Sequence, residues 1–306
     1  MAETDILLST YNGEQFLNEQ LVSIAAQSYS DWRLLVRDDS SSDRSLTILK
    51  SFAQSMPDKK VLIFQAEENS GPAESYAELL SFSSAPYVLF ADQDDIWLPE
   101  KITVLKEAMN ELELKFGRNI PLLVYSDMKV VNHNLQPVAE SFFAYNALPA
   151  EINNLSQLFF FNNIPGCTML VNRALIDFAM PFPEEVIMHD WWLNLSVNIA
   201  GHFHFVNRPL LLYRYHSSNF YGTGKFNIKK YFNIKEYKNN LLRMIGQISA
   251  FEERYAGLID DENIRNALFQ LKNIRRYNCL KRKYTLFKYA GVPGKKMRKI
   301  SMLIFG

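Results

Sequence analysis

The chain has little cysteine and no apolar run long enough to span a membrane. Cys167 and Cys279 are the only two cysteines among 306 residues, so we predict no disulfide framework and a reducing compartment. A spanning helix needs about 20 consecutive apolar residues, and no stretch of that length occurs. The first residues are polar and run straight into a predicted strand, so we expect no secretory signal. These absences argue against a secreted disulfide scaffold or an integral membrane protein, and they predict a cytoplasmic protein.

The chain also lacks net charge, because an acidic part and a basic part cancel. Residues 1–221 hold 14 lysines and arginines against 27 acids, and residues 222–306 hold 19 against 6. The last stretch, 281–306, has eight basic and no acidic side chains, interleaved with aromatic and aliphatic ones. This mixture favours an anionic membrane surface over a nucleic acid, because apolar side chains need burial. A helical region packed on the acidic part is the open alternative, and we expect no nucleic-acid partner.

Acidic residues, in contrast, are crowded at one point of the chain. Asp92, Asp94 and Asp95 lie directly after the apolar run 87–90, which predicts a buried strand. Carboxylates this close repel one another unless a cation or hydrogen-bond donors compensate. Mg²⁺ and Mn²⁺ prefer oxygen ligands and take further ones from a phosphate. The run therefore predicts a metal–diphosphate site, with an alternative in which Asp95 caps a helix that starts near Pro99.

The region around this run alternates between apolar strands and amphipathic helices. Four strands are predicted, each followed by a polar or acidic turn, and three helices separate them. Ligands of such sheets bind outside the carboxyl ends of the strands, where every one of these turns lies. The alternation predicts an α/β fold with a mostly parallel sheet flanked by helices. The strands are expected at 5–8, 32–37, 61–65 and 87–90, and the helices at 14–27, 44–54 and 73–82.

A second group of candidate residues lies in the middle of the chain. A strand is expected at 122–127, an apolar helix at 153–161, and a loop that leads into a strand at 168–171. The segment Met188–Asp190 then opens a helix. Asp190 is either an N-cap or first-turn acid, which the helix dipole favours, or a general base.

The polar turns, taken together, carry a family resemblance. The motifs are Ser9–Gly13, Arg37–Asp43, Asn69–Gly71, Ala91–Trp97, Gly166–Met169, His189–Leu193 and Tyr213–His216. They resemble the signature of inverting family 2 glycosyltransferases with the GT-A fold, over about residues 4–222. They look most like bacterial rhamnosyltransferases that build cell-surface polysaccharide from dTDP-L-rhamnose. The resemblance implies a Rossmann-like catalytic domain at 1–222, with a nucleotide-sugar half at 1–100 and an acceptor half at 101–222, and a helical, basic C-terminal extension at 223–306.

The resemblance also implies roles for individual side chains. Asp190 would be the catalytic base, and Asp94, Asp92 and His216 would hold Mg²⁺ or Mn²⁺ at the diphosphate of a nucleotide-sugar donor. The acceptor would be a glycan or lipid-linked glycan, so a peripheral position at the inner face of the membrane is expected. The side chains implied in donor binding are Thr10, Tyr11, Asn12, Glu14, Asp39, Asn69, Asp92, Asp95 and Arg214. The acceptor-side candidates are Gly166, Cys167, Thr168, Trp191 and Trp192.

Two departures from the family pattern bear on the surroundings of the base and on the donor, respectively. His189 stands where the family often has a glutamate, and no glycine follows His216 as in rhamnosyl-type relatives. A UDP-hexose donor is therefore the alternative within the same reaction. A sugar nucleotidyltransferase is disfavoured, because the loop after the first strand has one glycine and no basic residue to hold a triphosphate. A non-catalytic binding module is disfavoured because the base and the acidic cluster are both present.

Overall fold

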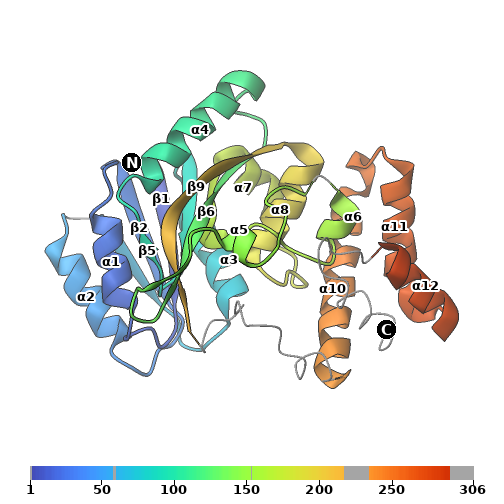
Figure 1. Cartoon of the computed structure of the whole chain (residues 1–306), viewed down its shortest axis with the longest axis horizontal. Coiled ribbons are helices and arrows are strands. Elements are labelled where there is room, and N and C mark those ends of the chain that lie inside the picture. Colours follow the sequence, from blue (N-terminus) through green and yellow to red (C-terminus); the bar gives the residue numbers. More distant parts are fainter. Residues whose placement is uncertain (1, 58–59, 153, 217–233, 290–306) are drawn as a thin grey trace.

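The structure, a computed structural model, describes residues 2–57, 60–152, 154–216 and 234–289. Its centre is one nine-stranded sheet with helices on both faces (Figure 1). The predicted α/β class is thus confirmed. Among the described residues, no helix is both long and apolar enough to cross a bilayer.

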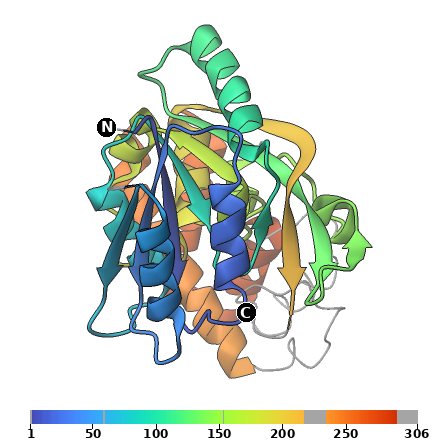
Figure 2. The same cartoon turned by 90° about the vertical axis from the view of Figure 1, so that its left-hand side faces the viewer.

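Most strands of the sheet point the same way. The strands are β1 (Thr4–Thr10), β2 (Trp32–Asp38), β3 (Val61–Gln65), β4 (Tyr87–Ala91), β5 (Ile96–Trp97), β6 (Leu122–Asn132), β7 (Pro137–Ala139), β8 (Met169–Asn172) and β9 (His202–Tyr215). Their order is β3-β2-β1-β4-β8-β6-β9-β5, and β7 pairs with β6. Strands β5, β7 and β8 run antiparallel to their neighbours, and the other pairs are parallel. Figure 2 shows the arrowheads of β1, β2 and β9 directed toward one edge, which therefore gathers the predicted polar turns.

Alternating side chains of the central strands build two cores, one on each face of the sheet. In β1, Leu7 belongs to one core, and Ile6 and Leu8 belong to the other, because successive strand side chains point to opposite faces. The Ile6 face is covered by α1 (Leu17–Ala25), α2 (Ser45–Ser55) and α4 (Lys101–Phe116). The Leu7 face is covered by α3 (Pro72–Phe82), α5 (Phe142–Tyr145), α6 (Leu155–Leu158), α7 (Arg173–Ala179) and α8 (His189–Ala200).

The C-terminal helices extend the core on the Leu7 face. They are α10 (Ile234–Tyr255), α11 (Glu262–Lys272) and α12 (Cys279–Tyr289), joined by the short 3-10 turns η2 (Ala256–Leu258) and η3 (Ile274–Arg276). Phe251 of α10 packs edge-on against Phe159 and Trp192, at ring-centroid distances of 5.4 and 5.9 Å. Leu286 of α12 is fully buried in the same cluster. The described part of the C-terminal region is therefore helical and packs against α6 and α8.

Two local predictions were wrong, and one strand was missed. The helix expected at 153–161 is reduced to the four residues of α6, because Phe159 and Phe160 are both fully buried and do not form the single apolar stripe of a surface helix. Strand β9 had not been predicted. Asp95 caps no helix, because β5 intervenes and α4 begins after Glu100 without a side-chain cap.

Candidate functional site

One amide side chain fastens the turn after β1 to the acidic turn after β4. Gln93 Oε1 accepts a hydrogen bond from Thr10 Oγ1 at 2.6 Å and from Tyr11 N at 2.9 Å. Gln93 Nε2 donates back to Tyr11 O at 3.2 Å. A Cβ at Gly13 would clash with this amide, so the glycine leaves the room that the contact needs. The Tyr11 side chain is 48% exposed and so available to a ligand.

The turns after β1 and β2 are bound to each other. Asn12 N donates to Ser41 Oγ at 3.0 Å, and Asn12 Oδ1 accepts from Ser42 N at 2.9 Å. Glu14 Oε2 accepts from Arg44 N at 3.0 Å. Asn12 has a φ of 49°, a left-handed conformation in which asparagine is enriched. These contacts fix two of the predicted donor-binding side chains at the edge of the sheet.

Asp39, directly after β2, is a buried carboxylate surrounded by donors. Its Oδ2 accepts from Gly71 N at 2.8 Å, and its Oδ1 accepts from Ser70 N at 3.1 Å and from the Arg37 guanidinium. Burial raises the pKa of Asp39, but these hydrogen bonds outweigh burial and hold the pKa below its usual value. Asn69, the remaining candidate of this loop, is exposed.

The three acids after β4 differ in depth. Asp95 is fully buried, Asp92 is partly exposed, and the Asp94 side chain is 15% exposed. Burial, reinforced by repulsion from Asp94, raises the pKa of Asp92 to about 6. Burial, reinforced by Asp94 and Asp92, raises the pKa of Asp95 well above its usual value. The repulsion expected from the sequence is therefore present, and it marks a place where a positive charge is stabilising.

Two buried residues accompany these acids. Lys101 is fully buried, with its Nζ donating to Cys167 O and lying 3.8 Å from the centroid of the Trp97 ring. Burial lowers the pKa of Lys101 to about 8, against the opposing pull of Cys167, Asp95 and Asp92. Possible ligand atoms of Cys167, Asp92 and Asp95 lie within 4.8 Å of one another. Sequence reasoning missed Lys101. The feature that could have revealed it is a lysine at a position of the helix after the acidic run where the pattern expects an apolar core residue.

Asp94 pairs with His216 at the end of β9. Asp94 Oδ2 lies 3.0 Å from His216 Nε2, and both side chains are partly accessible, at 15% and 14%. The carboxylate oxygens of Asp94 and of the adjacent Asp92 suit Mg²⁺ or Mn²⁺, so these two acids fit a divalent cation, with the His216 imidazole beside them as a possible further ligand. The group of Asp92, Asp95 and Cys167 fits one less well, because a thiol is a soft ligand.

Arg214 of β9 is buried, and its guanidinium is already engaged. It donates to Asp94 O at 3.0 Å, to His133 O at 2.9 Å and to the Glu19 carboxylate. It also lies over the Phe16 ring, 4.4 Å from the centroid. These contacts favour a role in positioning the acidic turn, whereas the predicted diphosphate contact would need a side chain that reaches the ligand.

Asp190 lies in the first turn of α8, after the N-cap residue Met188. Its carboxylate accepts from Gly166 N at 3.0 Å and from Trp191 N at 2.6 Å. Burial, opposed by these two hydrogen bonds and reinforced by Asp92, raises the pKa of Asp190 to about 7. A carboxyl group that ionises near neutral pH is suited to general base catalysis.

His189, the departure from the family pattern, is buried in an aromatic cage. Its ring centroid lies 3.9 Å from that of Tyr76 and 4.7 Å from that of Phe90. Neither ring nitrogen has a hydrogen-bond partner. Burial lowers the pKa of His189 to about 3, so the ring is neutral. It fills the space between α8, α3 and β4 without adding a charge beside Asp190.

The acceptor-side candidates lie deeper than the sequence suggested. Gly166, Cys167 and Thr168 form the 3-10 turn η1 (Gly166–Thr168), and all three are buried. Trp191 Nε1 donates to Leu158 O at 2.6 Å, and Trp192 is fully buried with its Nε1 donating to Ala179 O at 3.1 Å. The two tryptophans therefore pack in the core. The turn η1 links two parts of the site, because Gly166 binds Asp190 while Cys167 adjoins Asp92 and Asp95.

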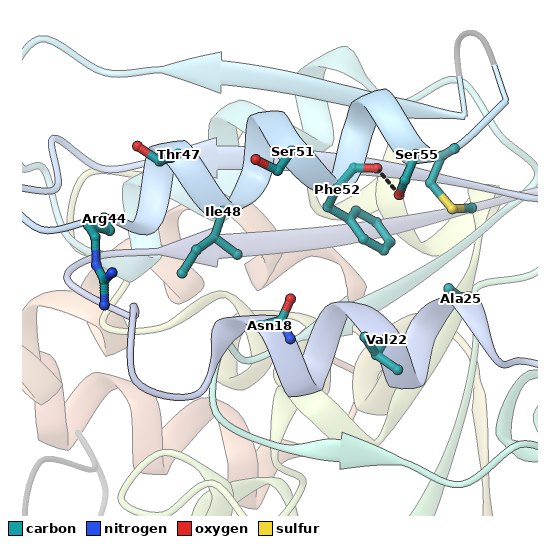
Figure 3. A pocket seen from close by; sticks show the side chains of 10 residues that line it. Asn18, Val22, Ala25, Arg44, Thr47, Ile48, Ser51, Phe52 and Ser55 are labelled. Carbon is teal, nitrogen blue, oxygen red and sulfur yellow. Dashed lines mark hydrogen bonds between the residues drawn. The ribbon is translucent and has the colours of Figure 1, made fainter.

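A groove of about 650 Å³ lies elsewhere, between α1 and α2. Figure 3 shows Asn18, Val22 and Ala25 of α1 facing a row of α2 side chains, with Arg44 at one end. The groove runs along the two helices on the Ile6 face, and its lining has no carboxylate. It contains none of the predicted catalytic or metal residues.

Comparison with known proteins gives a family match at the N-terminal part. Residues 5–116 match the family described as glycosyl transferase family 2. The dTDP-rhamnosyl transferase RfbG of Shigella flexneri is 27% identical over 69% of this chain and 72% of its own length. The UDP-Glc:alpha-D-GlcNAc-diphosphoundecaprenol beta-1,3-glucosyltransferase WfgD of Escherichia coli is also 27% identical, over 63% of this chain and 68% of its own length.

Solved structures show the same fold over nearly the whole chain. Residues 1–349 of TarS from Staphylococcus aureus, in complex with UDP, match 98% of this chain and 79% of their own at a TM-score of 0.58 and 18% identity. The mannosyltransferase PcManGT of Pyrobaculum calidifontis, in complex with GDP-Man and Mn²⁺, matches 99% of this chain and 79% of its own at a TM-score of 0.53 and 15% identity.

Proposed function

This chain carries a family 2 glycosyltransferase domain with the GT-A fold, and from this premise we propose that it catalyses inverting transfer of a sugar from a nucleoside diphosphate to an acceptor hydroxyl. One observation supports this most. The turn η1 binds the carboxylate of Asp190 through Gly166 and adjoins Asp92 through Cys167. A group with a pKa of about 7 and the acidic cluster therefore lie on either side of one short turn.

In the proposed reaction, Asp190 accepts the proton of the acceptor hydroxyl. The hydroxyl oxygen attacks the anomeric carbon as the bond from that carbon to the diphosphate oxygen breaks. The nucleoside diphosphate leaves with the electron pair, and the configuration at the anomeric carbon inverts. A base of pKa about 7 is ionised in a large fraction of molecules at neutral pH and still accepts a proton effectively.

The leaving diphosphate needs compensation of its negative charge. A divalent cation held by Asp94, His216 and Asp92 would supply the compensating positive charge and act as a Lewis acid. The 3.0 Å contact between Asp94 and His216 supports this assignment, and the Mn²⁺ in the complex of PcManGT supports the use of a divalent cation in general. The Arg214 contact to Asp94 O holds the acidic turn in place.

Within this proposal the donor is dTDP-L-rhamnose, and the acceptor is a surface-polysaccharide or lipid-linked glycan. The likeness to a dTDP-rhamnosyl transferase supports this donor. A UDP-hexose is the second candidate, because WfgD, named for UDP-Glc, is equally identical to this chain. Asp39, proposed to accept from the pyrimidine ring N–H, does not separate the two, since thymine and uracil both carry that group.

A donor competition tests the proposal. The full chain is given dTDP-rhamnose, UDP-glucose, UDP-galactose and UDP-N-acetylglucosamine in equal amounts, and release of dTDP and UDP is measured with Mn²⁺ or with excess chelator. We expect dTDP release to dominate and to stop with chelator. UDP release would change the donor but not the reaction. Undiminished turnover in chelator would contradict the proposed metal dependence. If neither dTDP nor UDP is released from any of these donors, the proposed donor classes are wrong.

We further propose that the catalytic domain occupies residues 1–222 and that 223–306 form a helical, basic C-terminal region. The proposed boundary and residues 290–306 of the basic tail lie outside the described residues. We place the protein in the cytoplasm at the inner membrane face, where a lipid-linked acceptor is accessible. The name of WfgD, which includes a diphosphoundecaprenol acceptor, supports this location.

A further inference from the structure

The helix α12 is apolar on two opposite faces. The helix contacts α11, and its inner face buries Thr285 and Leu286, which are 3% and 0% exposed. Its outer face carries Leu280, Tyr284 and Phe287, which are 81%, 65% and 47% exposed. Their spacing of four and three residues places these three side chains in one stripe along the helix. Burial against α11 therefore leaves the outer stripe in contact with solvent.

Basic side chains border this stripe. By the helical period of about 3.6 residues, Lys281 and Lys288 lie on one side of it and Lys283 lies on the other. Residues 275–289 contain six lysines and arginines and no acid. Two of the six, Arg275 and Arg276, are exposed in the turn η3, just before α12. The outer face is thus an apolar strip within a positively charged field.

An exposed leucine alone is ordinary and marks no partner. Leu114 of α4 is 89% exposed, but Glu107 and Glu111 precede it on the same helix face. Figure 1 shows α4 at the top of the molecule and α12 at the lower right, beyond α11. What distinguishes α12 is the combination of several exposed apolar side chains in line with uncompensated positive charge.

We propose that the outer face of α12 docks on an anionic lipid bilayer, with Leu280 and Tyr284 inserted among the lipid headgroups and Lys281, Lys283 and Lys288 bound to their phosphates. An amphipathic helix that lies in the interface buries its apolar side chains while its lysines reach the charged headgroups. The inference rests on α12 and not on the proposed function.

A bilayer fits this face better than other occupants. A nucleic acid would satisfy the lysines but leave Leu280 in water, since its phosphates offer no apolar surface. A second copy in a two-fold interface would bring two sets of six positive charges together, which is repulsive. An anionic bilayer satisfies the charges and the apolar side chains at once.

Cys279 provides a direct probe. It is exposed at the start of α12, whereas Cys167 is buried, so a fluorophore that senses polarity will attach at Cys279. The labelled full chain is titrated with vesicles of phosphatidylcholine alone, or of equal parts phosphatidylcholine and phosphatidylglycerol, at low and high salt. Sedimentation with the same vesicles measures binding of unlabelled protein. No nucleotide sugar is needed, so the result is independent of glycosyl transfer.

We expect a blue shift and binding only with phosphatidylglycerol, both weakened by salt. Leu280→Ser with Tyr284→Ser should weaken binding at least tenfold. Lys281→Gln, Lys283→Gln and Lys288→Gln together should weaken it about a hundredfold, at roughly fivefold for each charge. The matched control, Leu114→Ser, should bind like the wild type, and all variants should keep the wild-type unfolding temperature because none of these side chains is buried.

Three outcomes would overturn the proposal. The first is no binding of the full chain to phosphatidylglycerol vesicles. The second is an equal loss of binding in Leu114→Ser and in the α12 variants. The third is a change of the wild-type oligomeric state in Leu280→Ser with Tyr284→Ser, since the stripe would then contact a second copy.

Discussion

Asp190 is proposed to act as the general base, and its amide analogue tests this role. Asp190→Asn keeps an oxygen to accept from Gly166 N, so the turn η1 should hold its shape. We expect sugar transfer to fall about 10²–10⁴-fold, the usual contribution of one acid–base group. Donor affinity, measured by calorimetry, should stay within a factor of about two. Transfer near the wild-type rate would place the base elsewhere.

The same carboxyl group links activity and stability to pH. The pKa of Asp190 is about 7 in the folded protein against an ordinary value of 3.8. The folded state therefore binds this proton more tightly than the unfolded state, so Asp190 makes the protein less stable as pH rises from 3.8 to 7. We expect wild-type transfer to increase with pH up to about 7, while urea unfolding shows Asp190→Asn to be the more stable protein at pH 8. Equal stability of both proteins at pH 8 would contradict the raised pKa.

Gly166 donates a hydrogen bond to the proposed base, Asp190, and has no room for a methyl group. A Cβ there would lie 2.6 Å from His189 Nε2 and 3.3 Å from Asp190 Cβ. Gly166→Ala should shift the His189 ring and the Asp190 side chain, costing about 1–3 kcal/mol of unfolding free energy and at least tenfold in transfer. Gly257→Ala is the control, since its Cβ meets nothing within 4 Å. Urea unfolding and initial rates of the two variants decide the point.

At the residue scale, sequence patterns could locate the acids but not their surroundings. Asp92, Asp94 and Asp190 were found because short motifs surround them in the chain. The burial of Lys101 beneath Cys167 O, and the cage around His189, depend on contacts between distant segments. No local pattern records such contacts, so the pKa of each acid could be known only from the structure.

Among the elements, β9 does the most to assemble the site. Arg214 ties this strand to the acidic turn, to the turn after β6 and to α1 through Asp94 O, His133 O and Glu19. Arg214→Met leaves these acceptors unpaired, and we expect a loss of about 2–4 kcal/mol in urea unfolding. Arg208→Met on the same strand removes only an exposed pair with Glu100 and should cost about 0–1 kcal/mol. Equal costs would show that Arg214 does not organise the strand.

Elements defined by local sequence could be predicted, whereas elements defined by packing against distant segments could not. Strands β1 to β4 are short apolar runs, each followed by a polar turn, so local sequence sufficed. Strand β9 alternates exposed and partly buried residues only at 202–205 and is mostly buried at 210–214, and the segment around Phe159 and Phe160 is apolar without a period. Both are defined by the segments they pack against, and the local sequence does not show which distant segments these are.

For the whole molecule, the sequence predicted a basic C-terminal region but left open whether it binds an anionic membrane surface or packs on the acidic part of the chain. The structure shows that α12 contacts α11 and buries Leu286, while Leu280 and Tyr284 face outward. The inner face of α12 thus packs on α11, which belongs to the same C-terminal region, and the lipid alternative concerns the outer face. Charge counts could not separate these faces, because they sum over residues that point in opposite directions.

Truncation separates the two faces and keeps the catalytic part as a reference. A chain that ends after Asn278 loses Leu286, whose burial is worth about 1.5–3 kcal/mol. We expect its unfolding temperature to fall by several degrees, at roughly 2–4 °C per kcal/mol, and its vesicle binding to be lost. Donor hydrolysis should survive, because the described contacts of the candidate site come from the strand ends, η1 and α8. A chain that ends after Tyr289 keeps α12 and should retain the wild-type unfolding temperature and measurable vesicle binding. Loss of donor hydrolysis in the shorter chain, at a temperature where it is folded, would instead make the C-terminal helices part of the donor site.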